Sequence, residues 1–261
     1  MCIRDRYFLD GLGTDRRKGN TPRGTGAVGG LPVGMKFDPR QGKELQAFIE
    51  SVGNLMLDVL APGGFATVFS QPRLSHRMGV GLEDAGFEIR DMFAWHYTRR
   101  AQFKAFSMNH FVDRMNISDS DKEQMKLKLR GRKTPQLRPQ FESIILAQKP
   151  MKWTFGENWM RYETGLIDPN ARLDGNVPAT VMTVEKPDKS DRNGHLTVKP
   201  VLLVEHLIKL FSLPGQVVLD PFLGSGTTAI VAHRTGRACI GIEIDADIFK
   251  KALQRIQEAV K

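Results

Sequence analysis

The stretch from Gln216 to Asp245 constrains the fold of this chain more than any other part of its sequence. Its first apolar run, Val217 to Leu219, is short and β-branched, which is typical of a buried parallel strand. A glycine turn follows, then a segment with helical apolar spacing that stops near Gly236, and then a second apolar run from Ala238 to Ile242. This order predicts a βαβ unit and therefore an α/β fold.

The glycine turn of this unit has the features of a ligand-binding turn. At such a turn the backbone N–H groups and the N-terminus of the next helix come close to a ligand. Glu243 ends the second strand about 20 residues past the glycines, where a carboxylate can accept hydrogen bonds from both hydroxyls of a ribose. Gly224-Ser225-Gly226 lacks the third glycine of the dinucleotide pattern, which disfavours a pyrophosphate ligand. For the glycines alone, a purely structural tight turn is the alternative.

The longer string around these glycines is much more specific. Asp220-Pro-Phe-Leu-Gly-Ser-Gly-Thr-Thr, followed by Gly241-Ile-Glu-Ile-Asp, resembles the cofactor-binding motifs of amino-group DNA methyltransferases that use S-adenosylmethionine. It is most similar to the permuted group of that family, in which the cofactor motifs follow the catalytic motif. The resemblance implies a Rossmann-like methyltransferase sheet, mostly parallel with one antiparallel strand, and an inserted target-recognition region.

The same resemblance implies roles for individual residues. Asp220 and the glycine turn would hold the methionine end of S-adenosylmethionine, Phe222 would lie near the adenine or the sulfonium, and Glu243 would bind the ribose. His195-Leu196-Thr197-Val198-Lys199-Pro200 is similar to the family's His-Pro-Thr-x-Lys-Pro element, whose threonine and lysine would meet the cofactor carboxylate. The implied cofactor-binding residues are Thr197, Lys199, Asp220, Pro221, Phe222, Gly224, Ser225, Gly226, Thr227 and Glu243.

The first residues of the chain depart from the family pattern. The family's catalytic tetrapeptide is Asp or Ser, two prolines and an aromatic residue, whereas here Arg4-Asp5-Arg6 precedes Tyr7. We expect Tyr7 to be the last residue of that tetrapeptide, where it would stack on a flipped base, and residues 1–6 to be a foreign leader. A genuine divergent N-terminus is the alternative. The central strand that ends in the tetrapeptide would then be missing, and we expect a marginally stable fragment that tends to associate.

Charge points to an anionic partner. The formal net charge is +9 and the isoelectric point about 9.7, which favours nucleic acid first and a membrane surface second. No apolar run approaches the roughly 20 residues of a membrane span. With Cys2 and Cys239 as the two cysteines, neither a disulfide framework nor a zinc site can be built, so we expect a cytoplasmic protein without a metal.

Basic residues gather in two segments that are expected to be loops, residues 11–36 and 98–140. The stretch from Lys126 to Arg138 has clustered Lys and Arg and no acid, a composition suited to phosphate contacts. A solvated surface segment is the alternative for both loops. The candidate residues for contacting double-stranded DNA are Arg16, Arg17, Lys126, Lys128, Arg130, Arg132 and Lys133.

Apolar periodicity predicts the remaining elements. Helices are expected at 43–60, 73–85, from Pro200 and at 246–260, and strands at 65–69, 87–97 and 141–146, the last one antiparallel. The C-terminal helix is expected to bury Phe249, Leu253 and Ile256. Residues 150–194, irregular and with aromatics among polar turns, are expected to form the target-recognition segment. It would separate a catalytic-side half, residues 7–149, from a cofactor-binding half, residues 195–261.

The predicted function is site-specific DNA methylation at adenine N6 or cytosine N4, as in restriction–modification systems. Two other functions stay open: a non-catalytic DNA-binding module with a residual cofactor pocket, and a methyltransferase acting on RNA or a smaller substrate. The methylated base is not fixed, because the first residue of the catalytic tetrapeptide is replaced. The recognition sequence cannot be read from residues 150–194.

Overall fold

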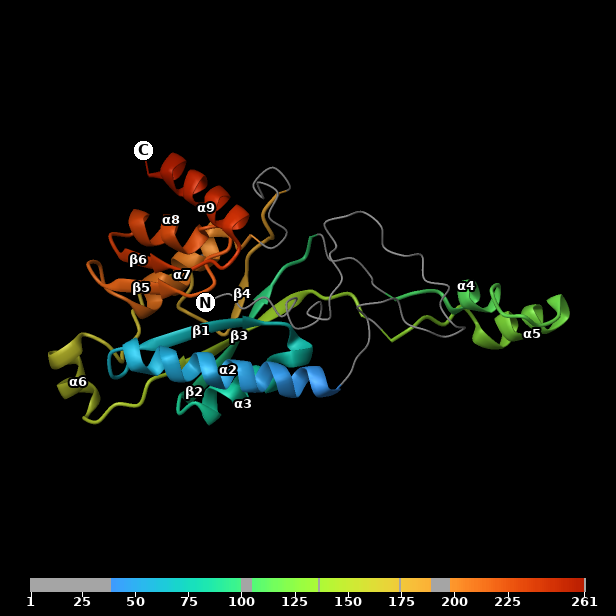
Figure 1. Ribbon diagram of the computed structural model, residues 1–261, viewed down its shortest axis with the longest axis horizontal. Helices are drawn as coiled ribbons and strands as arrows, with labels where there is room; N and C mark the ends of the chain where they lie inside the picture. Colours follow the sequence, from blue (N-terminus) through green and yellow to red (C-terminus); the bar gives the residue numbers. More distant parts are fainter. Residues whose placement is uncertain (1–38, 100–104, 136, 174, 189–197, 261) are drawn as a thin grey trace.

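The computed structural model describes residues 39–99, 105–135, 137–173, 175–188 and 198–260. In these ranges six strands form two separate sheets, a four-stranded one in the order β1–β3–β2–β4 and a two-stranded one, β5–β6 (Figure 1). The strands are β1 Phe65–Ser70, β2 Glu88–His96, β3 Phe141–Gln148, β4 Val181–Thr183, β5 Val217–Asp220 and β6 Ala238–Gly241. All five predicted strands are confirmed, and β4 is the one that the sequence analysis missed.

Helices surround both sheets. Their bounds are α2 Pro39–Val59, α3 Ser75–Asp84, α4 Met108–Val112, α5 Asp119–Leu129, α6 Phe155–Tyr162, α7 Val201–Phe211, α8 Thr227–Arg234 and α9 Ala246–Ala259, with a 3₁₀ turn at Pro72–Leu74. The helices that apolar periodicity predicted correspond to α2, α3, α7, α8 and α9. The predicted α/β class is therefore confirmed.

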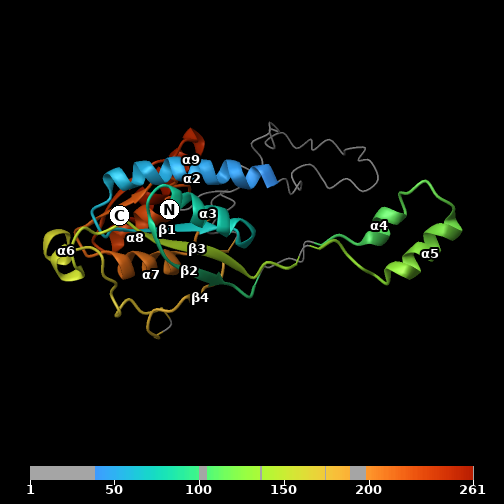
Figure 2. The same ribbon diagram turned by 90° about the horizontal axis from the view of Figure 1, so that it is seen from below.

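Strand β3 is central to the four-stranded sheet. It runs antiparallel to both β1 and β2, while β4 is parallel to β2 and β5 is parallel to β6. Residues 143–148 are all buried because both faces of β3 are covered. Figure 2 shows α2 and α3 on one side of the sheet and α7 on the other. Ile145 and Ala147 belong to the α2–α3 core, and Ile144 and Leu146 to the α7 core, as strand alternation requires.

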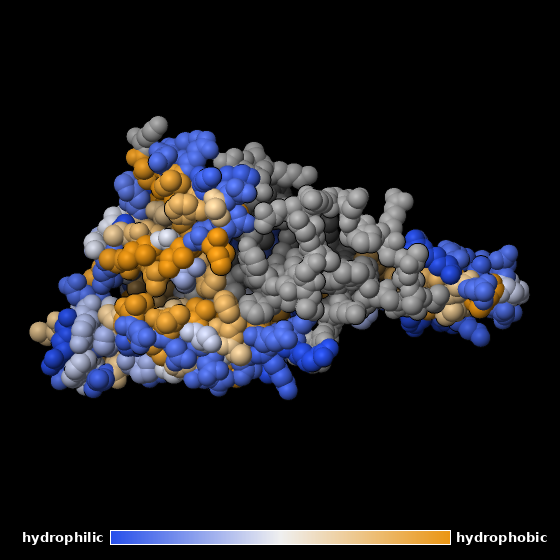
Figure 3. All heavy atoms as spheres, viewed as in Figure 1, coloured by the Kyte–Doolittle hydropathy of each residue, from blue (hydrophilic) through white to orange (hydrophobic). Residues whose placement is uncertain are grey.

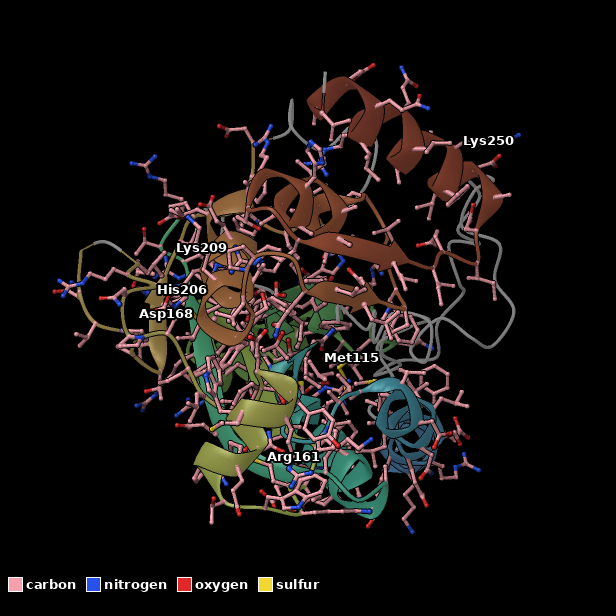
Figure 4. All side chains as sticks on the ribbon, turned by 90° about the vertical axis from the view of Figure 1, so that its left-hand side faces the viewer. Met115, Arg161, Asp168, His206, Lys209 and Lys250 are labelled. Atoms are coloured by element: carbon pink, nitrogen blue, oxygen red, sulfur yellow. The ribbon has the colours of Figure 1, made fainter. Side chains whose placement is uncertain are left out.

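Helix α7 joins the two sheets. Leu203 and Leu207 pack in the core of the four-stranded sheet, whereas Val204 and Ile208 pack with Val231 of α8. Figure 4 labels His206 and Lys209 on α7 and shows this helix between the four-stranded sheet and the two-stranded sheet. The cofactor-binding half is thus held to the rest of the chain through a helix that is apolar on two sides.

Residues 98–140 are not one loop, which corrects the sequence expectation. They contain α4 and α5, which project away from both sheets as a helical arm, residues 105–135 (Figures 1 and 2). The Ser118 side chain caps α5 by accepting from the Asp121 N–H at 3.1 Å. The predicted loop was wrong here because Asp119–Leu129 buries no side chain, so it has no apolar stripe for a periodicity search to find.

Residues 150–194 are also more regular than expected. Helix α6 begins with a capping box formed by Thr154 and Glu157, and β4 pairs with β2. The Asn158 amide of α6 donates at 3.0 Å to the Pro62 carbonyl, in the turn before β1. Part of the segment is therefore built into the four-stranded sheet.

The face between α2 and α9 is apolar and open among the residues that the structure places. Phe249 and Leu253 of α9 are 41% and 44% exposed, so the expectation that they are buried was wrong. Val217 and Ile240 of the small sheet and Leu55 of α2 are also exposed, and Figure 3 shows apolar residues gathered on this face. Within the described ranges β1 pairs only with β3, and β5 pairs only with β6, so β1 and β5 each have one free edge.

A search of the described helices for a membrane-spanning segment found none of sufficient length and apolarity.

Candidate cofactor site

The turn that follows β5 is held in a fixed shape. Gly224 and Gly226 have φ values of +57° and +79°, in the left-handed region that glycine adopts readily, and Gly226 is the N-cap of α8. Between them and β5, the Leu223 N–H donates at 2.8 Å to the Ile242 carbonyl beyond β6. A Cβ atom on Gly241 would lie 2.8 Å from the methyl carbons of Leu223, so a larger residue there would have to displace the Leu223 side chain.

Asp220 lies buried at the end of β5 and shapes the same turn. Its Oδ1 accepts from the Phe222 N–H at 3.1 Å and its Oδ2 from the Thr228 hydroxyl at 2.6 Å. The neighbouring Cys239 thiol has its pKa raised to about 11, first by burial and then by the charge of Asp220. Cys239 is therefore a protonated packing residue, as the sequence indicated.

Glu243, just past β6, meets the turn from the other strand. Its Oε2 accepts from the Gly224 N–H at 2.9 Å, and its Oε1 accepts from the Asp245 N–H at 3.0 Å. The structure thus brings both acids of the sequence motif into hydrogen bonds with backbone N–H groups of one glycine turn. An ionised carboxylate can accept about four hydrogen bonds, so the two bonds that each acid makes leave room for ligand donors.

Arg255 of α9 supports the turn and was missed by the sequence analysis. Its Nη1 donates to the Ser225 carbonyl at 2.9 Å and to the Thr227 hydroxyl at 2.9 Å, and the Ser225 and Thr227 hydroxyls are 3.3 Å apart. No motif marks this arginine, because its contacts join positions 28 and 30 residues apart.

Phe222 lies between the turn and the α2 core. Its ring centroid is 6.1 Å from that of Phe48, and it packs against the buried cluster around α2 and α3. The aromatic residue of the motif therefore connects the turn to the four-stranded sheet. Trp95 and Tyr97 are almost fully buried and belong to the α7 core.

Lys199 is placed at the start of α7 and contacts an acid that the sequence analysis did not single out. Its Nζ lies 2.8 Å from Oε2 of Glu142, whose Oε1 is 3.1 Å from the Nζ of Lys186. Burial by itself would raise the pKa of Glu142, but the charges of the two lysines hold it below its usual value. We refer to Glu142, Lys186 and Lys199 as the lysine–glutamate cluster.

The basic residues of the helical arm differ in their surroundings. Lys126 lies on α5 with its Nζ 2.7 Å from the Asp113 carboxylate and 3.2 Å from that of Glu123, and the hydrogen bond to Asp113 is the main reason its pKa is raised. Lys128, Arg130 and Arg132 are exposed at the end of α5 and just beyond it.

Four of the predicted site residues lie outside the described residues: Tyr7, Arg16, Arg17 and Thr197.

The chemistry of these groups fits S-adenosylmethionine. Its ammonium and its two ribose hydroxyls are donors for carboxylates such as Asp220 and Glu243, and its carboxylate needs a cation such as Lys199. The N-terminus of α8 presents backbone N–H groups at the turn. Across the ranges that the structure describes, no three His, Cys, Asp or Glu residues gather as metal ligands would.

Comparison with known proteins agrees with this chemistry. The family model described as DNA methylase, N6_N4_Mtase, matches residues 33–254. The chain is 30% identical over 226 residues to Type II methyltransferase M.HindIII of Haemophilus influenzae, covering 84% of this chain and 71% of that protein. It is 27% identical to Type II methyltransferase M2.DpnII of Streptococcus pneumoniae, covering 78% of this chain but 64% of that protein, which is less than two thirds.

The fold is also found among solved structures. The M1.HpyAVI–SAM complex superposes with a TM-score of 0.56 at 20% identity and covers 84% of this chain and 85% of that one. At this identity the likeness shows a shared fold. Because the family model spans most of the sequence, and M.HindIII is matched over most of both chains, the protein belongs to the N6/N4 DNA methylase family, the S-adenosylmethionine-dependent methyltransferases of amino groups in DNA.

Proposed function

We propose that this chain carries the cofactor-binding half, and part of the catalytic half, of an enzyme that methylates adenine N6 or cytosine N4 in double-stranded DNA. The observation that carries the proposal is the pair of carboxylates, Asp220 and Glu243, both hydrogen bonded to backbone N–H groups of one turn. The basic composition and the exposed cations of the arm support DNA as the substrate. The two cysteines without a disulfide framework support a cytoplasmic location.

The chemistry requires positioning more than acid–base work. An exocyclic amino nitrogen is a poor nucleophile because its lone pair is delocalised into the base, and the cofactor supplies an electrophilic methyl group. Asp220, Glu243 and Lys199 would fix the two ends of the cofactor, so that the methyl group meets the nitrogen in line. The target base must leave the duplex, and we assign its stacking partner to Tyr7.

We also propose that a strand ending in the catalytic tetrapeptide completes the sheet between β1 and β5. Each of these strands has one unpaired edge among the described residues, and unpaired edges leave N–H and C=O groups without partners. The exposed side chain of Val217, on the free-edged strand β5, would gain apolar cover from such a strand.

Methyl transfer from labelled S-adenosylmethionine to mixed duplex DNA tests the function. The chain as given is compared with a version in which residues 1–6 are replaced by a strand that ends in Asp-Pro-Pro. We expect label in DNA only with the second version, and digestion of the product should give N6-methyladenine or N4-methylcytosine. Label in 5-methylcytosine would overturn the proposed function. Activity of the chain as given would overturn the proposal that a further strand is needed to complete the sheet.

Two further measurements test the other functions. Duplex binding measured beside the transfer assay, with no label transferred by either version, favours a non-catalytic DNA-binding module. When RNA is offered in place of duplex DNA, label in the RNA and none in the DNA favours a different substrate.

The helical arm leads to a prediction about DNA affinity. Replacing Lys128, Arg130 and Arg132 together with Gln should make the slope of log K against log salt less negative by about 2.7 if each cation neutralises one phosphate. Lys126→Gln is the matched control, because Lys126 is already paired with Asp113 and releases little counterion on binding. Fluorescence anisotropy with a labelled duplex, titrated at several salt concentrations, measures both slopes. If Lys126→Gln changes the slope by as much per charge as the triple replacement does, Lys126 also contacts DNA phosphate, and the distinction between paired and exposed cations of the arm is wrong.

A further inference from the structure

Arg255 links the last helix of the chain to the glycine turn. Its Nη1 donates to the Ser225 carbonyl and to the Thr227 hydroxyl, each at 2.9 Å, and lies 3.4 Å from the Ser225 hydroxyl. The acids that bind this turn, Asp220 and Glu243, belong to the two strand ends of the βαβ unit. Arg255 instead reaches the turn from α9, a helix that follows that unit in the chain.

A turn built on two glycines depends on hydrogen bonds for its shape. Gly224 and Gly226 have φ values of +57° and +79°, and because glycine has few forbidden conformations, other turn shapes would cost little backbone strain. Hydrogen bonds therefore select among these shapes. The Gly224 N–H donates at 2.9 Å to Glu243, and the Gly226 N–H donates at 3.1 Å to the Leu223 carbonyl.

Arg255 fixes the peptide group between Ser225 and Gly226. A trans peptide group is planar, and its C=O and N–H point in opposite directions. Here the C=O accepts from Arg255 while the N–H donates to the Leu223 carbonyl, so the plane is held at both ends. Arg255 also holds the hydroxyl of Thr227, the first residue of α8. The orientation of the α8 N-terminus, whose backbone N–H groups lie at the turn, thus depends on α9.

Packing brings α9 close to the same turn. A Cβ built on Gly226 would lie 2.9 Å from Cδ1 of Ile256 and 3.4 Å from the carbonyl oxygen of Ala252. Ala252, Arg255 and Ile256 are spaced by three and four residues, so they share one face of the helix. The guanidinium is therefore carried by a packed helix, which restricts its position more than a loop would.

We propose that Arg255 is a positioning residue that holds the glycine turn in the shape that binds S-adenosylmethionine, which makes α9 part of the cofactor site. The inference rests on the proposed function, since it takes the turn held by Asp220 and Glu243 to be the place where the cofactor binds. A turn that already has its bound shape spares the complex the cost of ordering it. Arg255 acts in this way through Ser225 and Thr227 and without touching the cofactor.

Isothermal titration calorimetry with S-adenosylhomocysteine on the 261-residue protein tests this role. Arg255→Met keeps an apolar stem but removes the donors, and it should weaken S-adenosylhomocysteine about five- to tenfold, because the turn must then be ordered on binding. Arg255→Lys should restore part of the affinity. A single nitrogen of Arg255 makes the contacts to Ser225 and Thr227, and an ammonium can supply donors in its place.

Hydrogen exchange of the α9 amides gives a second readout, which a merely structural role would not change. If docking of α9 raises the affinity for the ligand, then the ligand must stabilise docked α9 by the same factor. Saturating S-adenosylhomocysteine should therefore slow exchange in α9 about five- to tenfold in the unmodified protein and less than about twofold in Arg255→Met. Equal slowing in the two proteins would overturn the proposal.

Two controls lie on the same helix or at its start. Lys250→Met removes the same charge from an exposed position on α9, where Figure 4 shows the side chain pointing away from the rest of the protein. It should change neither affinity nor exchange. Asp245→Ala removes the N-cap of α9 and controls for loosening of the helix. If it weakens the ligand as much as Arg255→Met does, Arg255 has only a structural role and the proposal is wrong.

Asp220→Ala separates failure of this proposal from failure of the cofactor site. Unchanged S-adenosylhomocysteine affinity in Arg255→Met, with Asp220→Ala defective, would reject the positioning role and leave the cofactor site standing. Unchanged affinity in both variants would reject the cofactor site and the positioning role together.

Discussion

Replacing Gly226 with alanine is expected to destabilise the protein by about 2–5 kcal/mol, the largest effect that we expect from a single substitution here. Two costs add. Gly226 has a φ of +79°, where an L-residue pays roughly 1–2 kcal/mol, and its new Cβ would lie 2.9 Å from Cδ1 and 3.0 Å from Cγ1 of Ile256. Alanine would therefore strain the turn and push α9 away from α8.

Urea unfolding of a matched pair separates the two costs. Gly215 has a φ of +87° and no atom within 4 Å of a built Cβ, so Gly215→Ala should carry the backbone cost alone. Gly226→Ala should lose about 1–3 kcal/mol more than Gly215→Ala, the usual range for overpacking. Equal losses in the two variants would show that α9 yields to the methyl group without cost.

Replacing Asp220 or Glu243 with alanine is expected to weaken S-adenosylmethionine at least about tenfold. Each change removes charge-assisted hydrogen bonds, which are worth about 1.5–3 kcal/mol. It also releases part of the turn, because Asp220 holds the Thr228 hydroxyl and Glu243 holds the Gly224 N–H. Calorimetric titration with S-adenosylmethionine measures the loss of affinity. The protein with both substitutions should bind the cofactor more weakly than either single variant.

A control is needed for general loosening of this region. Asp245 caps α9 by accepting from the N–H groups of Asp247 and Ile248, so Asp245→Ala should cost about 1 kcal/mol of stability while changing cofactor affinity less than twofold. Cofactor affinity that is unchanged in both Asp220→Ala and Glu243→Ala would contradict the assignment of this site.

Much of the fold could be predicted from the sequence because it is local in origin. The five predicted strands and the helices α2, α3, α7, α8 and α9 have apolar residues repeating with the period of their structure. The elements that were missed lack that signal. Helix α5 buries nothing, α6 is eight residues long, and β4 is a three-residue strand recognised only through its pairing with β2.

The βαβ unit, its glycine turn and the two acids at its strand ends could be predicted from the sequence, because a strand, a turn and a helix depend on neighbouring residues. The contacts of those residues depend instead on how distant elements pack. Lys199 contacts Glu142, 57 positions away, and Arg255 contacts Ser225, 30 positions away. Lys126 of α5 is paired with Asp113, the residue that follows α4. Such pairs form where separate elements pack together, and no local period or spacing in the sequence records them.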